Sequence, residues 1–184
     1  MKLFRSKFYW CAAVFIILAV VGYVGSTYAS LRSVDHHMPL VVLSLLPKSN
    51  VVNREIVDFE LTRRISNGEF DGVMVLMDTL SVGALSGASH QAIRQRVEWL
   101  LDDLVGINQH SILGLTPLHI AVANNDLDAA RFLIELGAEP SVKAVASLDG
   151  SDGSDAIEFA QYACNVFPDR DYSQLIRLLE TNLE

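Results

Sequence analysis

The side chains that could do chemistry in this sequence stand mostly as adjacent pairs, which is a poor arrangement for catalysis. Ser89 and His90 are neighbours in the chain, but a nucleophile and its base are brought together by the fold, not by adjacency in sequence. Asp102 and Asp103 are also consecutive, and consecutive side chains on a helix point in different directions. The sequence contains no nucleophile elbow, phosphate loop, dinucleotide loop or zinc-protease helix motif. We therefore predict that the protein is not an enzyme and has no catalytic residues.

Metal and cofactor binding have equally little support. His36 and His37 are adjacent, but with no cysteine and no second histidine cluster they make a poor metal site. We predict no metal ligands, no cofactor-binding residues and no small-molecule substrate. The function must then depend on a binding surface that the helices and loops of the fold form.

Residues 114–140 predict two short helices in succession. Thr116 is placed to cap the first helix with its hydroxyl, and Pro117 occupies the first helical position, where a missing donor costs nothing. Asp126 can cap the second helix, and Gly137 can end it in the left-handed conformation. Helices of fewer than about 12 residues are marginal alone, so each must be buried against neighbours. This pattern is typical of a repeat protein.

The same stretch resembles one ankyrin repeat. Thr-Pro-Leu-His-x-Ala is followed by a turn, an apolar helix and Gly-Ala-Glu at that family's spacing. Asn125 stands where the family usually has a turn glycine, and asparagine tolerates the left-handed conformation well. In this context we expect the His119 imidazole to bond back to Thr116 and to adjoining backbone. The signature residues are Gly114, Thr116, Pro117, Leu118, His119, Ala121, Gly137 and Ala138.

Weaker repeats are predicted on both sides of the clear one. Residues 53–80 are interpreted as a degenerate first repeat, with Asn67 to Asp71 as its turn. The distance from that turn to the next exceeds the ankyrin period of about 33 residues, so we predict an inserted helix over 90–104. This helix either packs on the stack or contacts a partner. The predicted fold class is all-α, a stack of about three ankyrin repeats whose outer members are degenerate.

The third repeat follows Pro140. Residues 155–160 stand in register with residues 116–121, and about six more residues than the regular period separate them. We expect the extra residues to lie in 147–154, an acidic, glycine-rich finger on the binding side. Asp171 is predicted to cap the last helix.

The N-terminal part predicts a membrane segment. Residues 8–25 are apolar and follow the basic residues 1–7, as in an anchor whose N-terminus stays in the cytoplasm. A secretory signal peptide cleaved near Ala29 is the competing interpretation. Both place the remainder outside the cytoplasm, and the low cysteine count and short chain suit a bacterial periplasm. The predicted organisation is a cytoplasmic tail, a single inner-membrane anchor, a linker over 26–38 and an ankyrin-repeat domain over 39–184.

Acidic charge is concentrated in the second half of the chain. The formal net charge is −8, and residues 98–184 hold 15 acidic and 4 basic side chains. Such a field repels nucleic acid and attracts a basic protein surface. Solubility alone is the alternative explanation. The predicted partner contacts are Asn124 and Asp126 on the turn between helices, with Asp149, Asp152 and Asp155 in the acidic finger.

The resemblance implies a rigid, non-catalytic surface that binds another protein. A membrane-anchored periplasmic protein with a few divergent ankyrin repeats is similar to immunity proteins that neutralise type VI secretion effectors, such as phospholipases. The alternative is a periplasmic scaffold that protects or organises an envelope enzyme, as in anchored ankyrin proteins linked to peroxide resistance. The immunity role is our first hypothesis, and the scaffold is its alternative.

Overall fold

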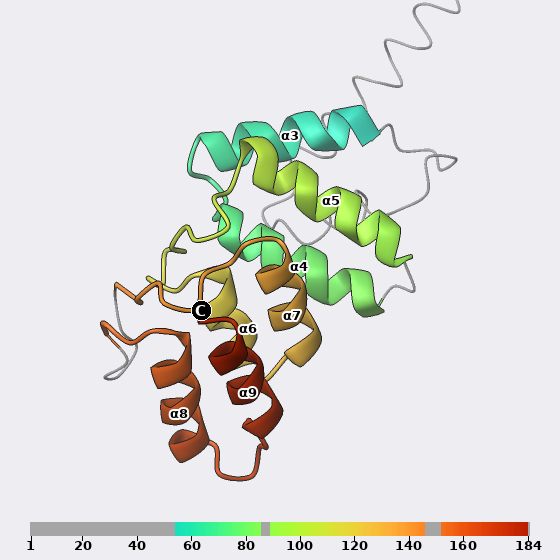
Figure 1. Cartoon of the computed structure of the whole chain (residues 1–184). Coiled ribbons are helices and arrows are strands. Elements are labelled where there is room, and N and C mark those ends of the chain that lie inside the picture. The colour runs from blue at the N-terminus through green and yellow to red at the C-terminus, as the bar shows by residue number, and fades with distance from the viewer. Residues whose placement is uncertain (1–53, 86–88, 146–151, 184) are drawn as a thin grey trace, which may run out of the picture.

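The computed structural model of the chain describes residues 54–85, 89–145 and 152–183 (Figure 1). The predicted tail, membrane segment and linker, which together cover residues 1–38, lie outside these ranges, as does Asp149. Among the described helices, none is both long enough and apolar enough to cross a membrane.

The described ranges contain seven helices and no strands. The helices are short, and turns or longer loops join them. In chain order they are α3 (Arg54–Ser66), α4 (Gly72–Leu85), α5 (His90–Asp103), α6 (Pro117–Ala123), α7 (Leu127–Glu135), α8 (Ala156–Val166) and α9 (Ser173–Thr181).

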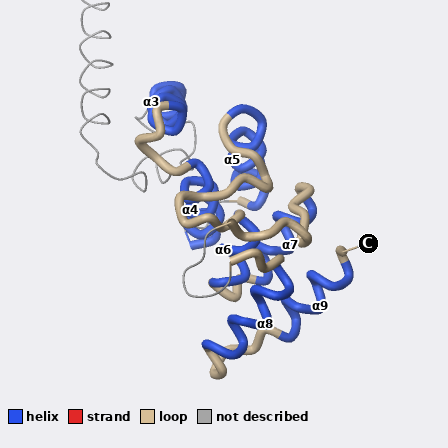
Figure 2. Tube along the Cα trace, turned by 90° about the vertical axis from the view of Figure 1, so that its left-hand side faces the viewer, coloured by secondary structure: helices blue, strands red, loops and turns tan. Residues whose placement is uncertain are grey.

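Six of these helices form three stacked hairpins, in which α4 packs on α5, α6 on α7, and α8 on α9. The first helices of the hairpins, α4, α6 and α8, lie next to one another in one layer, and α5, α7 and α9 form the second (Figure 2). Helix α3 lies at the N-terminal end of the stack. The Nη1 atom of Arg96 on α5 donates to Oδ1 of Asp58 on α3 at 2.7 Å and ties the two together.

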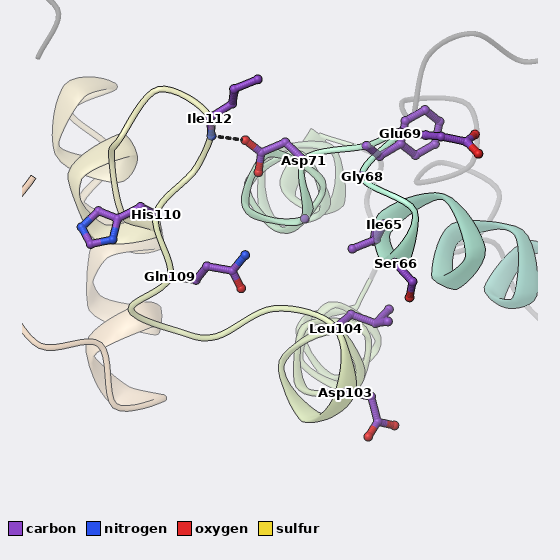
Figure 3. Close-up of a pocket in the computed structure, with 12 residues that line it drawn as sticks. Ile65, Ser66, Gly68, Glu69, Asp71, Asp103, Leu104, Gln109, His110 and Ile112 are labelled. Carbon is purple, nitrogen blue, oxygen red and sulfur yellow. Dashed lines mark hydrogen bonds between the residues drawn. The ribbon is translucent and has the colours of Figure 1, made fainter. Parts of the chain in front are cut away.

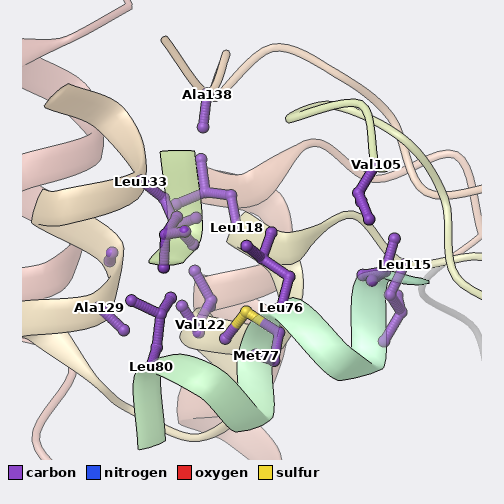
Figure 4. Close-up of a cluster of buried hydrophobic side chains, with 14 of the residues drawn as sticks. Leu76, Met77, Leu80, Val105, Leu115, Leu118, Val122, Ala129, Leu133 and Ala138 are labelled. Atoms are coloured by element: carbon purple, nitrogen blue, oxygen red, sulfur yellow. The ribbon is translucent and has the colours of Figure 1, made fainter. Parts of the chain in front are cut away.

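The hydrophobic core runs continuously between the two layers from hairpin to hairpin. Leu76 and Leu80 of α4 meet Leu118 and Val122 of α6 and Leu133 of α7 (Figure 4). These five side chains are buried in the described structure. Burying one leucine side chain stabilises a fold by roughly 1.5–3 kcal/mol. Contacts of this kind supply the stability that short helices lack alone.

The pairing of the first repeat differs from the prediction. The predicted repeat over 53–80 pairs α3 with α4, whereas the structure packs α4 on α5. At the end of α5 the Val105 N–H donates to the Leu100 carbonyl at 2.9 Å, and at the end of α7 Ala138 donates to Leu133 at the same distance. The two bonds stand one 33-residue period apart.

Helix α5 is therefore the second helix of a repeat and not an insertion. Helix α3 ends in the same way, because Glu69 N–H donates to the Arg64 carbonyl at 2.8 Å. It takes the place of a second-layer helix ahead of α4. Apolar periodicity correctly indicated each helix, but it does not say which neighbours pack together.

The predicted helix ends of the clear repeat are confirmed. Thr116 is the N-cap of α6 with Pro117 directly after it, and Asp126 caps α7 by accepting from the Ala129 N–H at 2.9 Å. Asn125 and Gly137 adopt positive φ angles of 54° and 97°. These local rules act within a few residues, which is why the sequence alone predicts them.

Asp71 caps α4 and also supports the loop of the next repeat. Its Oδ1 atom accepts from the Val73 N–H at 2.9 Å, and its Oδ2 atom accepts from the Ile112 N–H at 2.6 Å. One carboxylate therefore begins a helix and holds a loop 41 residues further along the chain.

This double role can be separated by substitution. We expect Asp71→Ala to lower the free energy of unfolding by about 1–2 kcal/mol, because α4 loses its cap. Asparagine caps as well as aspartate, but its amide cannot accept from both helix and loop. Asp71→Asn should therefore retain more stability while the Ile112 amide exchanges faster with deuterium. Unchanged exchange at Ile112 in Asp71→Asn would contradict the proposed support.

Candidate functional surface at the fingers

Two loops project from the same end of the hairpins and are here called fingers. The first finger (104–116) joins α5 to α6, and the second finger (136–155) joins α7 to α8, with residues 146–151 outside the described ranges. Ser111 N–H donates to the Leu115 carbonyl at 2.8 Å in the first, and Ala144 N–H donates to the Ser154 carbonyl at 2.9 Å in the second. These bonds are equivalent, so the residues by which the second finger exceeds the first fall between Ala144 and Ser154 in the sequence; most of the predicted range 147–154 lies outside the described residues.

The two fingers are bonded to each other along their length. Val145 N–H donates to the Gly114 carbonyl at 3.0 Å, and Glu139 N–H donates to Oδ1 of Asn108 at 3.0 Å. The Nε2 atom of His110 lies 2.8 Å from the Lys143 carbonyl, which can only accept. The fingers therefore form one supported ridge.

Large apolar side chains stand exposed on this ridge. Ile112 is 88% exposed, Val145 62% and Leu113 42%. We call these three residues the fingertip patch. Larger exposed apolar patches often mark protein–protein interaction sites, which makes this ridge a candidate surface. The sequence interpretation missed them, because an Ile-Leu pair before a repeat signature reads as core.

A cavity of about 420 Å³ lies beside the first finger, between it and the C-terminal ends of α3 and α5 (Figure 3). Ile65 and Gln109 point toward each other across it, whereas Glu69 and Asp103 point away from its centre. Asp71 is engaged by Ile112, as the dashed bond shows. The ionisable groups at the cavity do not converge on one point, as a catalytic site would require.

A buried ion network fixes the wall that α3 contributes to this cavity. Glu60 is fully buried and accepts from Arg63 at 2.9 Å and from Arg64 Nε at 2.7 Å. Arg63 also bonds to Glu69 at 2.7 Å, and the Arg64 guanidinium lies 4.9 Å from the centre of the Phe70 ring. The hydrogen bond from Arg63 is the main cause that lowers the pKa of the Glu60 carboxyl. A paired charge of this kind is far less costly to bury than a lone one.

The structure places the predicted partner-binding residues that it describes near the two opposite ends of α6. Asn124 and Asp126 follow α6 at its C-terminal end, whereas Ser154 of the second finger contacts His119 in the first turn of that helix. Asp152 is exposed on the second finger. Whether these residues bind a partner stays a prediction, and the two groups do not form a single site.

Asp155 has a structural task as well. Its Oδ1 atom accepts from the Ile157 and Glu158 N–H groups at 3.0 and 2.9 Å, and the Glu158 side chain accepts from the Asp155 N–H in return. This reciprocal arrangement is a capping box at the start of α8. A substitution of Asp155 would therefore disturb α8 whether or not a partner is bound.

His119 bonds to Thr116 as predicted, but its second partner is a carbonyl of the second finger and not backbone next to it in the sequence. Its Nδ1 atom lies 2.8 Å from Oγ1 of Thr116, and its Nε2 atom lies 3.2 Å from the Ser154 carbonyl. Because a carbonyl only accepts, Nε2 must carry the proton, and neutral Nδ1 then accepts from the Thr116 hydroxyl. The ring also packs edge-on against Phe159 at 5.4 Å. Burial lowers the pKa of the imidazole below its ordinary value of 6.5.

In comparison with known protein families, residues 61–144 match a family described as ankyrin repeats (3 copies). Ankyrin repeats are therefore present in the part of the chain that runs from the end of α3 through α4 to α7, with the whole first finger and the beginning of the second. No curated protein and no solved structure gives a significant match. Ankyrin repeats indicate a protein–protein interaction module, and proteins built from them are generally non-catalytic.

The state of His119 makes stability depend on pH. In the unfolded chain this histidine takes up a proton near pH 6.5, whereas in the folded protein it stays neutral to a lower pH. The unfolded state then binds more protons, so the free energy of unfolding should fall as the pH drops below 6.5. The loss should reach at most about 1.4 kcal/mol at pH 5.5, and the contribution should be complete above pH 7.5.

Urea unfolding at pH 7.5 and pH 5.5 measures this effect. The comparison is with His119→Gln, which removes only this ionisable group. We expect a smaller difference between the two pH values in the variant. An equal difference in both proteins would show that His119 is protonated while folded.

Proposed function

We propose that the protein binds another protein through the fingertip patch and the adjoining cavity. The observation that carries this proposal is the 88% exposure of Ile112, whose own backbone is fixed by Asp71 at 2.6 Å. A flexible loop would turn such a side chain away from water, but the first finger is held by Asp71 and by the second finger. Since the surface is already ordered, a partner would meet little ordering cost.

Charge supports a partner whose contact surface is apolar at its centre and basic around it. The second half of the chain carries the acidic excess, and Asp152 is exposed on the second finger next to the fingertip patch. Complementary charge chiefly raises the association rate and selects against acidic partners. The apolar centre would supply most of the affinity.

For the cellular role, we propose that the protein is an immunity protein anchored in a bacterial inner membrane, with its repeats in the periplasm. It would bind and neutralise an antibacterial secreted effector such as a phospholipase. The supports are the apolar segment after a basic tail, the ankyrin repeats and the ridge that can cover a partner's active site. An effector that attacks lipids would encounter this protein at the membrane in which the protein is anchored.

Co-expression tests this role directly. The product of the neighbouring gene is exported to the periplasm of a host with and without the full-length protein. Protection from its toxicity supports immunity. Toxicity that is unaffected would reject it. A neighbouring gene for a peroxide-removing enzyme that the protein protects would point to the scaffold alternative.

The fingertip patch gives the role a residue-level test. We expect Ile112→Asp to weaken binding of the effector that this protein neutralises at least tenfold, because a charge replaces the central apolar contact. Phe167→Ala is the matched control, since Phe167 is a 45% exposed aromatic side chain on the loop before α9. The measurement is the dissociation constant by surface plasmon resonance. Equal dissociation constants for the two variants would show that the fingertip patch is not part of the interface.

The acidic residue of the second finger is tested separately, by the kinetics of binding. We expect Asp152→Asn to slow association and to flatten its dependence on salt, while dissociation changes little. Asp155 is left intact because it caps α8. A salt dependence identical to that of the unmodified protein would leave Asp152 without a role in binding.

A further inference from the structure

The first hairpin is longer than the second, and this produces a step on the surface. Helices α4 and α5 have 14 residues each, whereas α6 has 7 and α7 has 9. Equivalent backbone bonds fix α5 and α7 in register at their finger ends. The additional turns of α4 and α5 must therefore extend past α6 and α7 at the opposite end, as Figure 1 shows.

The step leaves a groove between the overhanging hairpin and the first turns of α7. Leu80 of α4 and Ile93 of α5 form one wall, and Ala129 and Phe132 of α7 form the other. The groove has a volume of about 170 Å³. Phe132 and Ile93 are only partly buried, so apolar surface remains accessible inside it.

Carboxylates stand at the rim of this groove, which we call the step groove. Asp126 lines it while capping α7, and Asp128 lines it with a side chain that is 95% exposed. Arg131 approaches Asp128 only to 3.8 Å. Such a distant, exposed ion pair neutralises little.

The arginine that lies over the Phe132 ring also has an acidic partner. Arg94 lies 5.7 Å from the centre of the Phe132 ring, and its Nε donates to Glu98 at 2.9 Å. At this groove, whose lining also includes His90, three carboxylates (Asp126, Asp128 and Glu98) thus stand against two guanidinium groups (Arg94 and Arg131), and the acidic excess of residues 98–184 adds to this negative balance.

The volume and the charge of the step groove together determine which ligand it can hold. Pockets that hold small molecules usually measure about 300–1,000 Å³, so the step groove is too small for most of them. It suits a single aromatic or branched aliphatic side chain. Its acidic rim favours lysine or arginine on either side of that side chain, and it disfavours a second copy of this acidic chain.

We propose that the step groove is a second protein-docking site, which takes one large apolar side chain flanked by Lys or Arg from a partner protein. It lies at the opposite end of α6 from the fingers. The proposal does not depend on the fingertip patch, and its test does not require the partner that the fingers bind.

Three capped tripeptides serve as probes for full-length ¹⁵N-labelled protein in amide chemical-shift titrations. They are acetyl-Lys-Phe-Lys-amide, acetyl-Glu-Phe-Glu-amide and acetyl-Lys-Ala-Lys-amide. We expect the first to bind with a dissociation constant of about 1–10 mM and to shift amides around Ile93, Ala129 and Phe132. The second should bind at least fivefold more weakly, and the third should cause no shifts there.

Variants locate the binding. Asp128→Asn should weaken the Lys-Phe-Lys peptide severalfold and reduce its salt dependence, whereas Asp152→Asn at the fingers should leave it unchanged. Ala129→Leu fills the groove and should abolish binding. If that variant is unstable to urea, Phe132→Ala, which removes a wall, replaces it.

Several outcomes would overturn the proposal. They are the absence of shifts at millimolar peptide, equal binding of the Glu-Phe-Glu peptide, shifts confined to the fingers, and unchanged binding in a folded groove variant. Shifts at the groove amides that grow with protein concentration, without peptide, would make a second copy the occupant and reject a distinct partner.

Discussion

Contact between successive hairpins is the constraint on which this structure depends. No described helix exceeds 14 residues, and α6 has only 7, so none would persist in water alone. The first layer is held by fully buried small residues such as Ala121 and Ala160, which let neighbouring helices approach closely. His119 adds a polar link from α6 to the second finger. Each repeat thus depends on contacts with the next repeat for its stability.

The same dependence explains why the fingers can present apolar side chains to water. The first finger is fixed by Asp71 from the preceding hairpin and by the second finger on its other side. Its tip cannot collapse onto the core without breaking these bonds, several of which involve backbone groups that would be costly to leave unpaired. The bonds to neighbouring segments thus hold the finger in the conformation that exposes Ile112.

Local rules in the sequence were sufficient to predict the clear repeat. The caps at Thr116 and Asp126, the left-handed residues and the His119 bond depend on a few adjacent positions, and all are confirmed. The partners of α4 could not be predicted in this way. Helices α3 and α5 both flank α4 in sequence, and hydrophobic periodicity is compatible with either pairing.

The same limit applies to the candidate surfaces. Asp155 has the same side chain in the sequence as Asp152, but its position before α8 gives it the capping box while Asp152 stays exposed. The fingertip patch and the step groove depend on how neighbouring hairpins meet. The groove in particular follows from a difference in helix length between two hairpins, and no residue of either hairpin indicates it alone.

The two surfaces place different demands on a partner. The fingers project as a ridge, so they fit a partner surface that is flat or hollow, whereas the step groove is recessed and needs a protruding side chain. Helix α6, which separates them, is only about 10 Å long at 1.5 Å per residue. A single partner that wraps around the edge of the stack can therefore reach both, and linked contacts of this kind raise affinity beyond either alone. Both proposed sites belong to the acidic part of the chain, so a basic partner would suit each of them.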